Sequence, residues 1–184
     1  NGDGFGIAWY GRRTETGLYK DVHPAWSAVN LRSVANQVQS HLFLAHVRAS
    51  TGTAISRNNS HPFVVDNWSF MHNGLIGGFE QVRKKADMLI PDALYKHRKG
   101  ATDSEAFFLN ALGQGLDKNP KGAIAETVKL FESSRLSRPI CACLLPFQMA
   151  KSFMQCGMHL TAGPHRYITE GISETIVGRL FRKH

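Results

Sequence analysis

The sequence predicts one globular domain of the α+β class with an antiparallel sheet. Short apolar runs bounded by turn-forming residues come first and are typical of strands, and apolar residues at helical spacing are interleaved with them. The chain of 184 residues also contains no internal repeat and no low-complexity segment. A chain of this length buries about 70% of its unfolded surface, so one domain with a sizeable core is expected.

A β-hairpin is expected at the start of the chain. Residues 1–10 begin with glycine-rich turn chemistry and continue with alternating aromatic and small residues, which indicates a loop entering a strand. A second short strand at residues 18–22 would pair with the first through a turn at residues 12–17.

The next expected elements are a helix and two strands. Ser27 is a natural N-cap, and the apolar residues after it recur at a spacing that predicts an amphipathic helix over residues 28–39. Residues 42–47 predict a buried strand, and residues 68–72 predict another short strand. The polar loop between these strands, residues 49–62, has no periodicity, and long loops in compact domains are often functional.

Three helices are expected in the second half of the chain. Helical spacing covers residues 79–89 and returns after an N-cap at Thr102 or Asp103. Asn119 followed by Pro120 predicts the start of the third helix, because proline is favoured at the first helical position.

Composition and charge exclude several classes of protein. The net charge of +8 would allow contact with nucleic acid, but the basic residues are scattered, so nucleic-acid binding is not expected. No apolar run approaches the ~18 residues that span a membrane, and no charged-then-apolar leader opens the chain, so we expect a cytoplasmic protein. Cys141, Cys143 and Cys156 fit neither a disulfide framework nor a standard zinc spacing, and no metal or cofactor is expected.

Four segments are too polar for the strand ends and loop edges that they occupy. They are residues 46–51 (HVRAST), 60–63 (SHPF), 71–74 (MHNG) and 102–105 (TDSE). An arginine and an aspartate at such ends can form an amino-acid receptor, because the guanidinium grips a carboxylate and the aspartate accepts from an ammonium. An Asn-Gly pair can direct a side-chain amide and a backbone N–H to one point, as an oxyanion hole requires. These features indicate acyl transfer, although no nucleophile with an adjacent base accompanies them.

Each feature also has a purely structural explanation. The Asn-Gly pair alone is typical of a hairpin turn. Asp103 could cap its helix, Arg48 could form a surface ion pair, and His61 or His72 could be an ordinary half-buried imidazole. Taken one at a time, the structural explanations are favoured.

In combination and in this order, the four segments resemble the class II glutamine amidotransferases, a branch of the N-terminal nucleophile (Ntn) hydrolases. The nearest likeness is to the bacterial stand-alone branch, related to hydrolases that cleave γ-glutamyl amides in ergothioneine synthesis and glutathione breakdown. The likeness covers residues 1–139, which we expect to form the amidotransferase domain. It implies an αββα sandwich of two antiparallel sheets and hydrolysis of glutamine or a γ-glutamyl amide. An ammonia-accepting synthase partner or a homo-oligomer is also consistent with the resemblance.

The resemblance also implies roles for single residues. Arg48 resembles the arginine that holds the α-carboxylate of glutamine, with Thr51 lining the same pocket. Asp103 resembles the acid that receives the α-ammonium. Asn73, through its side chain, and Gly74, through its backbone N–H, resemble the oxyanion hole.

Further implications concern the amino-terminal part of the family's fold. His61 matches the histidine that braces the loop near the pocket, and residues 2–6 match the segment that supports the amino-terminal strand. The family's nucleophile is a cysteine at the mature amino terminus, whose own α-amino group is the general base. Because this chain begins with Asn1, we expect it to lack that cysteine and a central strand and to be inactive as it stands. A catalytically dead glutamine-binding or partner-binding module is the alternative.

Residues 140–184 are expected to differ from the family. They are rich in cysteine and methionine and show no helix or strand periodicity. A reading frame built from the third base of each codon and the first two bases of the next permits the string FSDGKSFYAVRYASD from Phe147 onward. This string has an Asp-Gly turn between apolar runs and resembles the hairpin that follows the family's last helix. We therefore interpret residues 140–184 as a frame-shifted tail, with a genuine divergent tail as the alternative that the coding DNA would distinguish.

Overall fold

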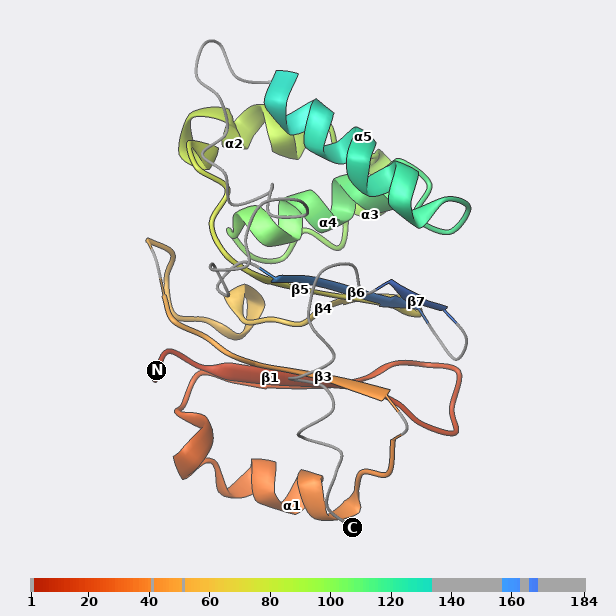
Figure 1. The fold of residues 1–184 in the computed structure, drawn as a ribbon. Coiled ribbons are helices and arrows are strands. Elements are labelled where there is room, and N and C mark those ends of the chain that lie inside the picture. The colour runs from red at the N-terminus through yellow and green to blue at the C-terminus, as the bar shows by residue number, and fades with distance from the viewer. Residues whose placement is uncertain (1, 41, 51, 134–156, 163–165, 169–184) are drawn as a thin grey trace, which may run out of the picture.

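Two antiparallel sheets stack face to face, with helices on both outer sides (Figure 1). The structure, a computed structural model, describes residues 2–40, 42–50, 52–133, 157–162 and 166–168. Helix α1 (Val29–Gln37) lies outside the first sheet, and the other helices lie outside the second. The expected αββα sandwich is therefore confirmed.

The first sheet contains three strands in the order β2-β1-β3. Strand β1 (Phe5–Tyr10) pairs antiparallel with β2 (Gly17–Asp21) and with β3 (Leu42–Val47), which confirms the predicted hairpin. Only one face of β3 is buried. Leu44 faces the second sheet and is 4% exposed, whereas Phe43 on the outer face is 44% exposed. The prediction of a fully buried strand at residues 42–47 is therefore wrong for the outer face.

The second sheet contains four strands in the order β4-β5-β6-β7. Strand β4 (Phe63–Val65), which the sequence pattern did not predict, pairs with β5 (Trp68–Asn73) through a tight turn in which Asp66 has φ 51°. On the other edge of β5 lies β6 (Gly157–Ala162), followed by β7 (Arg166–Ile168).

Strands β6 and β7 lie within the segment interpreted as a frame-shifted tail. They pair antiparallel in the reading frame of the printed sequence, although residues 140–184 show no strand periodicity. The hairpin continues the same sheet as β5, which lies in the predicted amidotransferase domain. The proposed domain boundary after residue 139 falls outside the described residues, and the frame-shift interpretation stays a prediction.

Three of the helices that cover the second sheet begin close to their predicted positions. These are α2 (Phe79–Met88), α4 (Asp103–Gly113) and α5 (Pro120–Ser133); the short α3 (Asp92–Tyr95) was not predicted. Thr102 is the N-cap of α4, since its hydroxyl accepts from Glu105 N at 3.2 Å.

The main core lies between the second sheet and these helices. Phe70 of β5 stacks on Phe107 and Phe108 of α4, with ring centroids 6.0 and 5.3 Å apart. Phe131 of α5 meets Phe107 edge to face. These buried rings anchor the start of α4 against the end of β5.

Helix α1 differs from its prediction. Ser27 belongs to a short 3-10 helix, η1 (Ala25–Ser27), and its hydroxyl donates to Pro24 O, so Ser27 is not the N-cap. Ala28 holds that position without a side-chain cap, and no residue of α1 is buried. Among the described residues of the whole chain, no helix is both long and apolar enough to cross a membrane.

Strands β3 and β5 end on the same side of the sandwich. Tyr10 pairs with Leu42 at the start of β3, and its hydroxyl donates to Ser69 Oγ at 2.8 Å, near the start of β5. Both strands therefore run away from this point along their own sheets. Their final residues, Val47 and Asn73, lie at the opposite end of the sandwich, where the first residues of β1 also lie. This end brings together all four polar segments, since His61 packs against His46 and Ser104 contacts His72.

Candidate functional site

Arg48 follows β3 at this end of the sandwich and is 4% exposed. Its Nη2 donates to Thr53 Oγ1 at 2.7 Å, to Thr53 O at 3.0 Å and to Ser50 Oγ at 3.2 Å. Its backbone N–H donates to Gly4 O at 2.9 Å, which joins Arg48 to the residue directly before β1. Burial lowers the pKa of the guanidinium, and the nearby Asp3 carboxylate partly offsets this effect. The explanation of Arg48 as a surface ion pair is therefore wrong.

Asp103 is the first residue of α4 and is 8% exposed. Its Oδ2 accepts from Ile76 N at 2.6 Å, and its Oδ1 accepts from Ser104 N at 2.7 Å and from Ser104 Oγ at 3.1 Å. Oδ1 thus accepts hydrogen bonds from the first turn of its own helix. Oδ2 accepts a hydrogen bond from the segment that follows Asn73. The helix-capping explanation accounts for the contacts with Ser104 but not for the contact with Ile76.

Asn73 and Gly74 are exposed at the end of β5. The chain continues from here into α2 and not into a returning strand, so the hairpin-turn explanation is wrong. Side chains alternate along a strand, so Asn73 lies on the same face as Ser69, the face toward the first sheet. Its neighbour His72 lies on the helical side, where its Nδ1 is 3.0 Å from Ser104 Oγ.

Two buried histidines, His61 and His72, and the half-buried His46 lie near these groups. His61 lies between His46 of β3 and Phe63 of β4, with ring centroids 4.6 and 4.7 Å away. Gly6 permits this packing, since an added Cβ there would collide with the His61 carbonyl. Among the described residues, neither ring nitrogen of His61 has a hydrogen-bond partner. His61 therefore packs as a neutral ring against β1. This packing is compatible with the predicted role of His61 in bracing its loop near the pocket.

The histidine pKa values show which charged groups face this cluster. Burial lowers the pKa of His46 to about 4, with smaller contributions from the nearby His72 and Arg48. Burial also lowers the pKa of His61 well below its ordinary value, and His46, His72, Lys20 and Arg48 add to this effect. The pKa of His72 is lowered by burial, whereas the Asp103 carboxylate raises it. Arg48 therefore acts on His46 and His61, whereas Asp103 acts on His72.

Two remaining expectations concern Thr51 and metal binding. Thr51 lies outside the described residues, so its role in the pocket stays a prediction. In the described part of the chain, no three His, Cys, Asp or Glu side chains converge in a group that could hold a metal ion.

The family model described as "Glutamine amidotransferases class-II" matches residues 1–135, almost three quarters of the chain. The chain belongs to the class II glutamine amidotransferases. This membership confirms the resemblance carried by the four polar segments, all of which fall inside the matched residues.

Several relatives are similar to this class II chain. The probable glutamine amidotransferase DUG3 of Saccharomyces cerevisiae is 42% identical over 129 residues, covering 66% of this chain and 36% of the yeast protein. The putative glutamine amidotransferase YafJ of Escherichia coli is 28% identical over 71% of this chain and 50% of that protein. A gamma-glutamyl-hercynylcysteine sulfoxide hydrolase of Mycobacterium tuberculosis is 31% identical over 41% of this chain and 33% of the hydrolase. The chain thus spans between a third and a half of the length of these curated relatives.

A solved structure also resembles this chain. The glutamine aminotransferase class-II domain protein from Silicibacter pomeroyi has a TM-score of 0.69 and 45% sequence identity, covering 88% of this chain and 65% of that chain. At this identity, the likeness supports both the fold and the family.

Some site residues of this class II chain were not assigned roles from the sequence. Ser104 contacts both His72 and Asp103, and Asp3 Oδ2 accepts from Ser50 N at 2.8 Å. Ser104 lies in one of the four polar segments and Asp3 in the glycine-rich segment of residues 2–6, but only the folded arrangement shows their partners.

We expect the free energy of unfolding to decrease as the pH falls below about 6.5. The folded chain binds protons at the histidine cluster less readily than the unfolded chain, because burial lowers the pKa of His46 to about 4. The stabilisation is complete above the unfolded pKa of about 6.5 and is lost as the pH falls toward the folded value. For His46 alone the full loss is roughly 3 kcal/mol. Urea denaturation at about pH 7.5 and about pH 5 should show roughly 2 kcal/mol of this loss.

A variant of the cluster separates it from other titrating groups. His46→Gln should reduce the pH dependence, because it removes the histidine whose pKa burial lowers to about 4. An unfolding free energy that stays constant over this pH range would contradict the buried neutral histidines.

Proposed function

We propose that the natural full-length protein hydrolyses the side-chain amide of glutamine, or a γ-glutamyl amide, to glutamate and ammonia or an amine. The observation that carries this proposal is the buried Arg48 at the same end of the sandwich as Asn73 and Asp103. A buried cation and a buried carboxylate at one end of a fold match the α-carboxylate and α-ammonium of an amino acid. The class II relatives support the same amide chemistry.

In this proposal, Arg48 receives the α-carboxylate of the substrate. Its present acceptors are carbonyl and hydroxyl oxygens, from Asp3, Ser50 and Thr53, which are weaker acceptors than a carboxylate. A bound carboxylate would replace the hydroxyl contacts. Asp103 receives the α-ammonium, because its carboxylate already accepts from three N–H or O–H donors and carries the charge that an ammonium requires.

The chemical step uses Asn73 and Gly74 as donors to the oxyanion. A cysteine thiol adds to the amide carbonyl, and the carbonyl oxygen becomes an oxyanion held by the Asn73 amide and the Gly74 N–H. Collapse of this intermediate expels ammonia or an amine, which takes up the thiol proton, and leaves a glutamyl thioester that water hydrolyses to glutamate. The described part of this chain contains no cysteine, so the proposed nucleophile would lie outside it.

Substituting Arg48 tests the carboxylate-binding role. Arg48→Met in the natural full-length protein should raise KM for the substrate about 10- to 100-fold, the equivalent of one charge-assisted hydrogen-bonding interaction. Arg57→Met is the matched control, because Arg57 is a largely exposed arginine in the neighbouring loop. Steady-state kinetics with glutamine measure both effects. A wild-type KM in a folded Arg48→Met variant would refute the assignment.

A further inference from the structure

Asn59 lies between the loop that follows Arg48 and the loop that precedes α4. It ends the short 3-10 helix η2 (Arg57–Asn59) and is 4% exposed. Its Nδ2 donates to Ala54 O at 2.8 Å, and its Oδ1 accepts from Ala101 N at 2.7 Å. One buried carboxamide thus uses both of its ends to join segments that are 42 residues apart in the sequence.

The two segments joined by Asn59 carry the two ends of the amino-acid site. On one side, Asn59 binds the residue directly after Thr53, whose hydroxyl and carbonyl accept from Arg48. On the other side, it binds an N–H two residues before Asp103. A continuous path of contacts therefore runs from the arginine to the aspartate through this one side chain.

At Gly100 the two segments are in close contact. A Cβ added to Gly100 would lie 2.5 Å from Asn59 Oδ1 and 2.6 Å from Asn58 O, and real Cβ atoms essentially never approach within 3.0 Å. Any other residue at this position would push the segments apart. The separation of the two ends of the site therefore depends on the glycine and on the carboxamide that contacts it.

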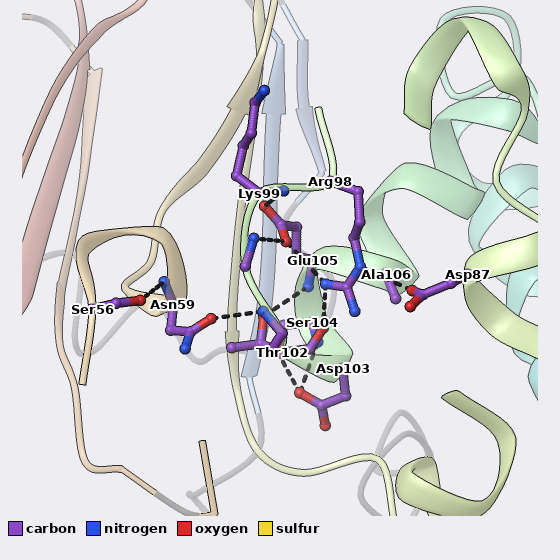
Figure 2. Close-up of polar contacts among 12 residues, drawn as sticks. Ser56, Asn59, Asp87, Arg98, Lys99, Thr102, Asp103, Ser104, Glu105 and Ala106 are labelled. Carbon is purple, nitrogen blue, oxygen red and sulfur yellow. Dashed lines mark hydrogen bonds and ion pairs between the residues drawn. The ribbon is translucent and has the colours of Figure 1, made fainter. Parts of the chain in front are cut away.

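The loop before α4 is fixed from its other side by Glu105 and Arg98 (Figure 2). The Glu105 carboxylate accepts from Gly100 N at 2.7 Å, from Lys99 N at 3.2 Å and from Arg98 Nη1 at 2.9 Å. Arg98 also pairs with Asp87 of α2 at 2.9 Å. Because helix α4 holds this loop rigidly, the contact with Asn59 fixes the η2 loop relative to the start of α4.

We infer that Asn59 is a positioning residue that sets the spacing between the carboxylate-binding and ammonium-binding ends of the site. This inference rests on the proposed function. L-Glutamate carries both groups and must engage Arg48 and Asp103 together, whereas glutarate lacks the α-ammonium and engages only the arginine end. Correct spacing therefore favours L-glutamate over glutarate, and Asn59 maintains that preference.

The test measures both compounds as competitive inhibitors of amide hydrolysis by the natural full-length protein. The selectivity is the inhibition constant of glutarate divided by that of L-glutamate. Asn59→Ala should lower this ratio about 3- to 10-fold, the equivalent of one hydrogen bond. Asn59→Asp keeps the acceptor for Ala101 N and should give an intermediate ratio. Asn58→Ala, the exposed neighbour, is the matched control and should keep the wild-type ratio.

The outcomes distinguish this inference from the proposed function. A general loss of folded protein lowers the amount of active enzyme without changing the ratio. A wild-type ratio in Asn59→Ala overturns the inference and leaves the proposed function standing. If Asn59→Ala does not fold, the same ratio is measured for Gly100→Ala, whose added Cβ displaces the Asn59 carboxamide. A lowered ratio supports the inference, and a wild-type ratio overturns it. Failure of the wild-type protein to hydrolyse glutamine and γ-glutamyl amides overturns the proposed function and this inference with it.

Discussion

Replacing Asn73 with alanine in the natural full-length protein should lower kcat by about 10²- to 10³-fold, as loss of one oxyanion donor does. Asn73 is exposed at the end of β5, and its carboxamide lies on the face of that strand toward the first sheet. The Gly74 N–H would remain as the second donor, so some activity should persist. Steady-state release of ammonia or amine measures the effect.

The control for this prediction is Asn30→Ala. Asn30 is an exposed asparagine of α1, the helix that lies outside the first sheet (Figure 1). It should leave kcat unchanged, while KM of Asn73→Ala should change much less than its kcat, because the oxyanion forms only in the transition state. A wild-type kcat for Asn73→Ala would remove Asn73 from the chemical step.

Arg98→Met should destabilise the fold by about 3–5 kcal/mol, the usual effect of removing one partner from a buried ion pair. The Arg98 side chain is 5% exposed and holds both Asp87 and Glu105 at 2.9 Å (Figure 2). Its loss would leave the Glu105 carboxylate, which is 6% exposed, without the guanidinium that pairs with it. Urea denaturation of wild-type and variant proteins measures the change.

An exposed ion pair provides the comparison. Lys129 and Glu126 form a pair at 2.7 Å with side chains 68% and 57% exposed, so Lys129→Met should cost less than about 1 kcal/mol. Adding Glu105→Gln to Arg98→Met should recover part of the lost stability, because it removes the unpaired charge. Equal effects of Arg98→Met and Lys129→Met would show that the buried network does not hold the loop before α4.

Local sequence patterns were sufficient for the elements whose signals lie within a few residues. The β1-β2 hairpin follows from its turn and alternation, and α4 and α5 follow from capping by Thr102 and Asn119. The N-cap at Ser27 was wrong because a 3-10 turn takes up its hydroxyl. Capping residues identify a helix start only where the preceding backbone is extended.

Pairings between distant segments could not be predicted in this way. Strand β4 has only three residues, and its neighbour β5 supplies its hydrogen bonds. The β6-β7 hairpin was missed because its strands show no clear alternation, and its edge partner β5 lies far away in the sequence. Such strands depend on the sheet that they join rather than on their own residues.

The candidate site shows the same division. The four polar segments, taken together and in order, indicated Arg48, Asn73 and Asp103 through their resemblance to the class II family. Asn59 gave no comparable signal, since asparagine in a long polar loop is common. Its importance comes from Ala101, which the fold places beside it.

The most direct test of the central claim is an assay of the natural full-length protein with L-glutamine and simple γ-glutamyl amides. We expect release of ammonia or amine with an equal amount of glutamate, and loss of most of that activity in Asn73→Ala. Binding of L-glutamate with no hydrolysis of any of these amides would contradict an enzymatic role and would indicate a glutamine-binding module instead.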